Sequence, residues 1–116
     1  MAKYTVLKSN TEFRTLYYRG RAQIHPALIT YTRKTRLKDE QGRPLVRMGI
    51  TTGKKIGKAV KRSRCRRVIR AAYSELYPRL HGSFDIVFVA RPRLLSLKST
   101  DLLPVMEQHL REAGLL

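Results

Sequence analysis

The sequence predicts an α+β fold in which three helices accompany a small mixed sheet, in the order helix, strand, strand, helix, strand, helix. Apolar residues recur at helical spacing in three segments, whereas three other segments alternate apolar with polar residues or are almost wholly apolar. The chain has 116 residues, of which 42% are hydrophobic, so it is long enough to bury a real core. We expect residues 1–116 to form a single domain.

The first helix is predicted over residues 10–18. Ser9 followed by Glu12 has the pattern of a capping box, and Gly20 follows as a stop signal. Adjacent residues point to different sides of a helix, so Tyr17 and Tyr18 cannot share a face and one of them can be exposed. The short apolar stripe of this helix consists of Phe13, Leu16 and Tyr17.

Two strands are predicted next. Residues 27–33 are rich in β-branched and aromatic side chains that alternate, and residues 46–51 alternate apolar with polar or small side chains. The polar segment 36–45 between them reads as a hairpin loop. The two strands are therefore expected to be antiparallel partners.

The last two elements are a strand and a helix. Residues 84–90 form an almost wholly apolar run, which is typical of a central strand covered on both faces. The final helix is predicted to begin with Asp101 as N-cap, to contain Pro104 in its first turn and to end at Gly114.

The most strongly charged segment precedes that central strand. Nine of the residues from 54 to 70 are basic, and no acid occurs between Glu40 and Glu75. From Cys65 onward the apolar residues recur at the spacing of one helical face, so this helix should have one side in the core and basic side chains elsewhere. The apolar face consists of Cys65, Val68, Ile69, Ala72, Tyr73 and Leu76. The basic residues are Lys54, Lys55, Lys58, Lys61, Arg62, Arg64, Arg66, Arg67 and Arg70.

This charge predicts a polyanionic partner. The formal net charge is +17, and five of the nine basic residues are arginines, which bind phosphate through two parallel hydrogen bonds. RNA is favoured because no helix-turn-helix pair or dimer element precedes the basic helix, as DNA binding would suggest. A membrane surface is the weaker interpretation, because the basic helix lacks a large exposed apolar face and no apolar run could span a bilayer.

Residues that would carry catalysis are missing from the pattern. The eight acids show no spacing of a two-metal carboxylate site, and His25, His81 and His109 are scattered. Cys65 lies on the apolar helical face, where packing is the favoured role. The single cysteine excludes an internal disulfide, and the N-terminal segment lacks the apolar stretch of a secretory signal, so a cytoplasmic location is expected. If a reaction occurs, we expect the protein side chains not to perform it.

The basic segment resembles the signature of the bacterial ribonuclease P protein subunit. Two positions depart from that signature: Ser63 stands in place of the usual asparagine, and Arg66 in place of the usual lysine. Weaker similarities extend along the chain, among them Phe13 with Tyr17 before Gly20. The matching positions are Lys55, Ile56, Gly57, Ala59, Val60, Arg62, Arg67 and Arg70.

The resemblance implies an α/β sandwich of the ribosomal protein S5 domain 2-like type, with a left-handed crossover through the basic helix. It implies a subunit that assists a catalytic RNA in endonucleolytic removal of the 5′ leader from precursor tRNA, with Mg²⁺ held mainly by the RNA and one protein per RNA. The basic residues above together with Ser63 would bind that RNA. Our candidates to line the cleft for the single-stranded leader are Phe13, Tyr17, Tyr31 and Arg91. The alternative for the three aromatic residues is ordinary core packing, and for Arg91 it is a solvated strand end.

Two other functions stay open on the sequence. A general structured-RNA-binding protein, of ribosomal or RNA-chaperone type, would share the charge and the helix but would need no leader cleft. A protein-only nuclease would cleave without any RNA subunit. Competition by a single-stranded leader distinguishes the first alternative, and an assay free of RNA distinguishes the second.

Overall fold

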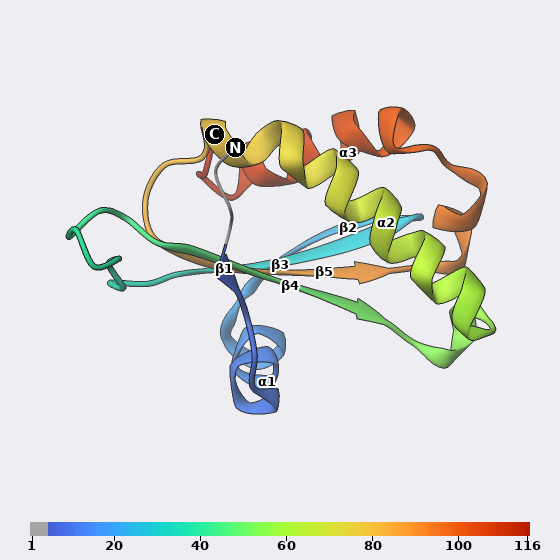
Figure 1. Cartoon of the computed structure of the whole chain (residues 1–116), viewed down its shortest axis with the longest axis horizontal. Helices are drawn as coiled ribbons and strands as arrows, with labels where there is room; N and C mark the ends of the chain where they lie inside the picture. Colours follow the sequence, from blue (N-terminus) through green and yellow to red (C-terminus); the bar gives the residue numbers. More distant parts are fainter. Residues whose placement is uncertain (1–4) are drawn as a thin grey trace.

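The computed structural model describes residues 5–116 and places a five-stranded mixed sheet between two helical layers (Figure 1). Helix α1 lies on one face of the sheet, and α2 and α3 lie on the other. The helices are α1 (Asn10–Arg19), α2 (Ala59–Leu76) and α3 (Ser99–Glu112), and the short 3-10 turns are η1 (Lys54–Ile56), η2 (Tyr77–Arg79) and η3 (Pro92–Ser96). The strands, in their order across the sheet, are β1 (Thr5–Val6), β4 (Val46–Thr52), β5 (Phe84–Ala90), β3 (Leu28–Lys34) and β2 (Arg21–His25).

Strand β5 is the centre of the sheet, as its apolar sequence predicts. Six of its residues are buried and only Val89 is partly exposed. It pairs parallel with β4 and antiparallel with β3. The prediction that the segments 27–33 and 46–51 are hairpin partners is therefore wrong, because β5 lies between them. The most apolar strand takes the central position, where both of its faces are covered.

Two strands were not predicted from the sequence. Strand β2 pairs antiparallel with β3 at the edge of the sheet, and all five of its residues are exposed or only partly buried. An edge strand with little burial carries no apolar alternation, so its sequence shows no strand signal. Strand β1 has only two residues and pairs parallel with the start of β4.

Helix α3 begins earlier than predicted. Its N-cap is Lys98, and Asp101 lies at the third helical position, where its carboxylate accepts the backbone N–H of Lys98 at 2.9 Å. The carboxylate thus caps the helix from inside its first turn, which is why Asp101 itself is not the N-cap. Pro104 consequently lies inside the helix.

Several local predictions are confirmed. The Ser9 hydroxyl accepts the Glu12 N–H at 3.2 Å, and the Glu12 carboxylate accepts the Ser9 N–H at 3.1 Å, so the capping box is present. All six residues of the predicted apolar face of α2 are buried. Helix α2 connects the parallel neighbours β4 and β5. The left hand of this crossover stays a prediction.

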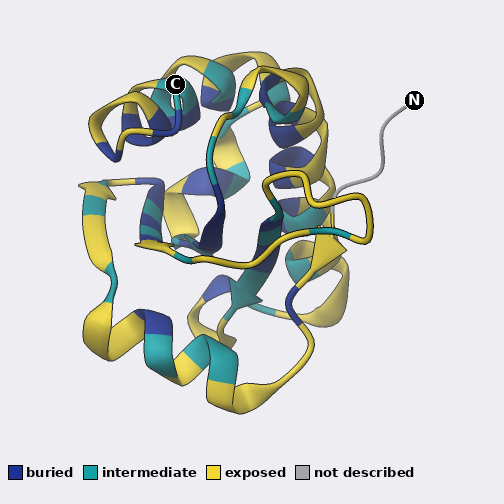
Figure 2. Cartoon of the chain, turned by 90° about the vertical axis from the view of Figure 1, so that its left-hand side faces the viewer, coloured by how far each residue is buried: buried dark blue, intermediate teal, exposed yellow. Residues whose placement is uncertain are grey.

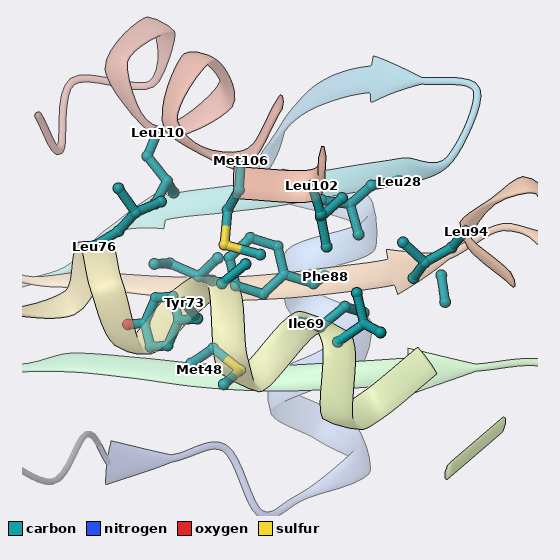
Figure 3. Packing of buried hydrophobic residues seen from close by; sticks show 14 of the residues in the cluster. Leu28, Met48, Ile69, Tyr73, Leu76, Phe88, Leu94, Leu102, Met106 and Leu110 are labelled. Carbon is teal, nitrogen blue, oxygen red and sulfur yellow. The ribbon is translucent and has the colours of Figure 1, made fainter. Parts of the chain in front are cut away.

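The main core lies between the sheet and the layer of α2 and α3 (Figure 3). Tyr73 of α2 packs edge-on against Phe88 of β5, with 5.5 Å between the ring centroids, and Met106 of α3 adjoins them. The opposite face has a much smaller buried cluster of Leu7, Leu16 and Val87. Within residues 5–116, no helix has the length and apolar character needed to cross a membrane.

Candidate nucleic-acid interface

The basic segment folds as a short turn followed by α2. Residues 54–56 form η1, and Gly57 has φ of 123°, a conformation that side chains rarely adopt. A Cβ at this position would also come within 3.0 Å of the Lys61 side chain. Gly57 therefore lets the chain turn sharply before α2 begins at Ala59. The basic side chains of α2 are concentrated in its first three turns.

The arginines of α2 lie on the two sides of the helix that border its buried face. Arg62, Arg66 and Arg70 follow one another at intervals of four on the flank beside β4, and we call these three the cleft flank. Arg64 and Arg67 lie on the flank toward α3, and we call these two the groove flank. Of the ten basic and serine residues predicted to bind RNA, Arg62 and Arg66 are partly buried and the other eight are exposed.

Arg66 is held in a defined position on the cleft flank. One of its terminal nitrogens donates to the Thr52 hydroxyl at the end of β4 at 2.8 Å, and the other donates to the Ser63 hydroxyl at 3.1 Å. Ser63, which replaces the asparagine of the family signature, thus orients an arginine. The two bonds fix the guanidinium at the end of the sheet, beside the face that α1 covers.

The groove flank adjoins the start of α3. A hollow of about 230 Å³ separates the two helices there, and we call it the α2–α3 groove. Lys98, the N-cap of α3, brings a third cation to the two arginines. The groove is lined by Arg64, Arg67, Val68, Ala71, Lys98 and Ser99.

A larger hollow of about 640 Å³ lies between α1 and the end of β4, and we call it the α1 cleft. Its α1 wall combines aromatic, amide and cationic side chains, and its β4 wall adds two hydroxyls. The α1 cleft is lined by Asn10, Phe13, Arg14, Tyr17, Tyr18, Ile50, Thr51 and Thr52.

A second hollow adjoins the α1 cleft on the side of the cleft flank of α2. This smaller hollow of about 160 Å³ shares Phe13 and Ile50 with the α1 cleft and is also lined by Arg66 and Arg70. Aromatic side chains on α1 and arginines on α2 therefore line two adjoining hollows, which offer ring faces for bases and cations for phosphates.

The aromatic residues predicted for the leader cleft lie close together. The rings of Tyr17 and Tyr31 meet edge to face with 5.2 Å between their centroids, and the Tyr17 hydroxyl bonds with the Thr51 hydroxyl at 2.6 Å. Phe13 lies over Gly49, where a Cβ would come within 2.4 Å of the phenyl ring. Gly49 therefore makes room for this ring.

Tyr31 and Arg91, the other two residues predicted for that cleft, are not among the residues that line the hollow. Tyr31 lies behind Tyr17, whose ring it contacts. Arg91 follows the last residue of β5, and its guanidinium donates to the backbone carbonyl of His25 at 3.3 Å. The side chain thus spans from the end of β5 to the turn between β2 and β3.

Helix α1 is fixed to the sheet by an ion network. Arg47 of β4 makes two bonds with the carboxylate of Asp85 at 2.8 and 2.7 Å and also pairs with Glu12 of α1. Hydrogen bonds to Glu12, above all from the backbone N–H of Ser9, lower the pKa of its carboxyl group. The hydrogen bond to Asp85 raises the pKa of Arg47. This network holds the first turn of α1, and with it the wall of the α1 cleft, at a fixed place on the sheet.

Sequence reasoning missed several residues of this interface. Arg14 and Tyr18 are four residues apart and share a helical face, which could have been seen from the spacing. Thr51 and Thr52 become part of the cleft only because β4 ends beside α1 and α2, and no local signal indicates that.

In the part of the chain that the structure describes, the side chains neither gather into a metal-ligand group nor expose a cysteine thiol. Within residues 5–116, no group of three or more His, Cys, Asp or Glu side chains could hold a metal ion. Cys65 is buried on the inner face of α2, and burial raises the pKa of its thiol. A buried thiol with a raised pKa is a poor nucleophile.

The fold and these surfaces define a small basic α+β protein with an aromatic cleft beside an arginine-rich helix. Comparison with known proteins matches residues 1–114 to the family Ribonuclease P. The ribonuclease P protein component of Symbiobacterium thermophilum is 35% identical over 116 residues, covering 100% of this chain and 96% of that protein. That of Clostridium beijerinckii is 34% identical over 110 residues, covering 94% and 88%.

Solved structures agree on the fold. The RNase P protein of Staphylococcus aureus superimposes with a TM-score of 0.79 at 24% identity, covering 97% of this chain and 98% of that one. The Thermotoga maritima RNase P protein gives a TM-score of 0.74 at 21% identity, covering 91% and 96%. The chain therefore belongs to the ribonuclease P protein family, whose members are subunits of the ribonucleoprotein that matures the 5′ end of tRNA.

Proposed function

We propose that this ribonuclease P subunit binds two RNA segments at once, one on each side of α2. The α1 cleft and the cleft flank would hold the single-stranded 5′ leader of precursor tRNA. The groove flank and the exposed lysines before α2 would dock on the catalytic RNA. The observation that carries this proposal is the bond between Arg66 and Thr52, which joins the basic helix to the aromatic cleft.

The chemistry of the α1 cleft suits a single strand. Unpaired bases stack on aromatic rings, and such stacking is tolerant of sequence because every base has a π-face. Phe13, Tyr17 and Tyr31 supply rings on the cleft side of the sheet, and Arg66 and Arg70 supply charge for the backbone. A mature tRNA has no leader, so it would lose these contacts and dissociate. Arg91, already bonded to the His25 carbonyl, would contribute through its remaining N–H groups.

The groove flank suits structured RNA. The deep major groove of an A-form helix hides its base edges, so a protein reads mainly backbone and shape. Arg64, Arg67 and Lys98 present three cations around the α2–α3 groove, and Lys61 lies exposed in the first turn of α2. Each phosphate contact would release counterions, and binding to the catalytic RNA should weaken steeply with salt.

The division of labour leaves phosphodiester hydrolysis to the RNA. Mg²⁺ would be held mainly by RNA phosphates, and the protein would reduce the repulsion between two polyanions so that less Mg²⁺ is needed. We expect one protein per catalytic RNA, acting in the cytoplasm. A general RNA-binding role without tRNA cleavage is disfavoured by membership of the family.

The test is cleavage of a precursor tRNA at low Mg²⁺ by the cognate catalytic RNA, with and without the protein. The main variant is Arg62→Ala combined with Arg66→Ala. The matched control is Arg79→Ala combined with Arg111→Ala, which removes the same charge from residues that pair with Glu107 on α3. We expect the wild type and the control to restore 5′ maturation and the main variant to lose most of it.

A second pair of measurements distinguishes the role of the groove flank from that of the cleft flank. Arg64→Ala with Arg67→Ala should weaken binding of the catalytic RNA and leave the preference for precursor over mature tRNA intact. Arg66→Ala with Arg70→Ala should reduce that preference. If the protein binds RNA in a salt-sensitive way but stimulates no cleavage, the subunit role assigned to these surfaces is wrong. Cleavage by the protein in a preparation free of RNA would instead indicate a protein-only nuclease.

A further inference from the structure

Helix α1 presents one aromatic side chain that the fold does not use. Tyr18 is 82% exposed, and it lines the α1 cleft together with Arg14. Within residues 5–116 its ring makes no ring contact, and its hydroxyl makes no hydrogen bond. Figure 2 shows α1 as the lowest helix, in which exposed stretches alternate with partly buried and buried ones. A large ring left open at the rim of a cleft is available for a ligand.

The neighbouring aromatic residues are already engaged. Tyr17 is only 38% exposed, its hydroxyl bonds with Thr51 at 2.6 Å, and its ring meets Tyr31 edge to face. Phe13 packs over Gly49. These contacts fix the two inner rings but cover part of their surface. Tyr18 therefore offers the largest open aromatic surface of the α1 cleft.

Arg14 stands one helical turn before Tyr18. Residues four apart on a helix have Cβ atoms about 5–6 Å apart, so the two side chains lie side by side. Arg14 is exposed and forms no ion pair within residues 5–116. A planar ring beside an unpaired guanidinium is the combination that binds a base together with its phosphate. Arg66 and Arg70 line the adjoining hollow, so the charge of this region complements an RNA strand.

We infer that Tyr18 and Arg14 form an outer subsite of the α1 cleft, in which Tyr18 stacks on one base of single-stranded RNA and Arg14 pairs with an adjoining phosphate. This inference rests on the proposed function, since it names two further residues for the same strand. It extends the bound leader by one nucleotide beyond the bases that Phe13 and Tyr17 can reach. Because stacking tolerates any base, the outer subsite favours longer leaders rather than particular sequences.

The experiment is an abasic scan of the leader with the holoenzyme. Precursor tRNAs that each lack one leader base are bound, under conditions that prevent cleavage, to holoenzymes containing wild-type protein, Tyr18→Ala or Tyr18→Phe. Leu37→Ala is the matched control, because Leu37 is another exposed hydrophobic residue, 40% exposed in the loop between β3 and β4. Each base and the tyrosine then form a double-mutant cycle.

We expect Tyr18→Ala to weaken binding of an intact precursor about five- to tenfold, the lower part of the range for base stacking on an exposed ring. At one leader position, removal of the base should lower the affinity of the wild-type holoenzyme by a similar factor. The same removal should not lower the affinity of the Tyr18→Ala holoenzyme any further. Tyr18→Phe keeps the ring and should behave as wild type. Mature tRNA should bind every variant equally.

Two results would overturn the inference while leaving the proposed function standing. In the first, wild type prefers precursor over mature tRNA and Tyr18→Ala keeps the full preference. In the second, Tyr18→Ala weakens precursor and mature tRNA alike. If the wild-type protein itself gives no preference for precursor, the proposed function fails and the inference fails with it.

Arg14 provides an independent readout. A single-strand phosphate contact contributes about 0.7 to the slope of log affinity against log salt concentration. Arg14→Gln should therefore reduce that slope by about 0.7 for the intact precursor and leave it unchanged for mature tRNA. An unchanged slope for the precursor would show that Arg14 makes no phosphate contact.

Discussion

The two faces of the sheet differ in how they are covered. The face toward α2 and α3 is sealed by a large apolar core that includes Tyr73, Phe88 and Met106, all fully buried. The face toward α1 has a buried cluster of only Leu7, Leu16 and Val87. There the helix is positioned by polar links, chiefly the bonds of Arg47 to Glu12 and Asp85.

The difference has a functional meaning. Apolar packing supplies most of the stability of a small domain, and one well-packed face can supply it. The other face can then leave aromatic side chains half-exposed along a cleft without unfolding the chain. The bonds of Arg47 to Glu12 and Asp85 tie the first turn of α1 to the sheet beside this cleft.

The largest expected effect on stability comes from removing a phenylalanine ring, and this change can be made on either face of the sheet. Phe88→Ala should lower the free energy of unfolding by about 4 kcal/mol, since it opens a cavity in the closed core. Phe13→Ala should cost less than half of that, because Phe13 is only partly buried, while lowering the affinity for a leader. Urea unfolding of both variants measures the difference. Equal costs would show that the α1 layer is packed as tightly as the main core.

A somewhat smaller effect is expected from the ion network. Arg47→Ala leaves the Asp85 carboxylate, whose side chain is 9% exposed, without its partner, and should cost about 3 kcal/mol. Arg47→Lys keeps the positive charge and should therefore retain part of the stability. It should not retain all of it, because an ammonium group cannot reproduce the two parallel bonds to Asp85. Arg43→Ala is the control: it removes an exposed pair with Asp39 and should change urea unfolding little.

The fit of Phe13 over Gly49 gives a third prediction. Gly49→Ala would place a methyl group 2.4 Å from the phenyl ring, so the ring must move, at a cost of about 1–2 kcal/mol and with weaker leader binding. Combination with Phe13→Ala should abolish the cost of the added methyl group. Gly53→Ala, where no atom lies within 4 Å, is the matched control. Additive losses in the double variant would mean that the two residues do not compete for space.

The smallest effect concerns pH and the closed face. His109 is buried against Thr30, with 2.8 Å between Nδ1 and the hydroxyl oxygen, and burial, with a contribution from His25, lowers its pKa below the usual 6.5. The unfolded chain then binds a proton more readily than the folded protein does. Stability should therefore fall as the pH drops below about 6.5, by no more than about 1.4 kcal/mol per pH unit.

Urea unfolding at pH 7.5 and 5.5 tests this dependence. The loss of stability should disappear in His109→Gln and persist in His81→Gln, whose histidine is exposed. Glu12, whose pKa is lowered, loses its stabilising contribution only at more acidic pH, below its usual value of 4.5. A wild-type protein equally stable at both pH values would contradict the prediction for His109.

The sequence by itself determined the features that depend on local periodicity. The six buried residues of α2, the capping box of α1 and the apolar central strand each follow from side chains within one segment, and the structure confirms them. The family signature in residues 54–70 is likewise local, and it predicted the family correctly. The positions of the predicted binding residues relative to one another do not follow from the pattern of side chains within any one segment.

Tertiary structure alone decided which segments are neighbours. Strand β5 separates β3 from β4, although those two are consecutive in sequence, because the most apolar strand gains most from the centre of the sheet. Thr52 of β4 positions Arg66, and the sheet leaves Tyr18 open while it engages Tyr17. Periodicity tells which face of an element is buried, but the partner that covers that face is fixed only when distant segments pack together.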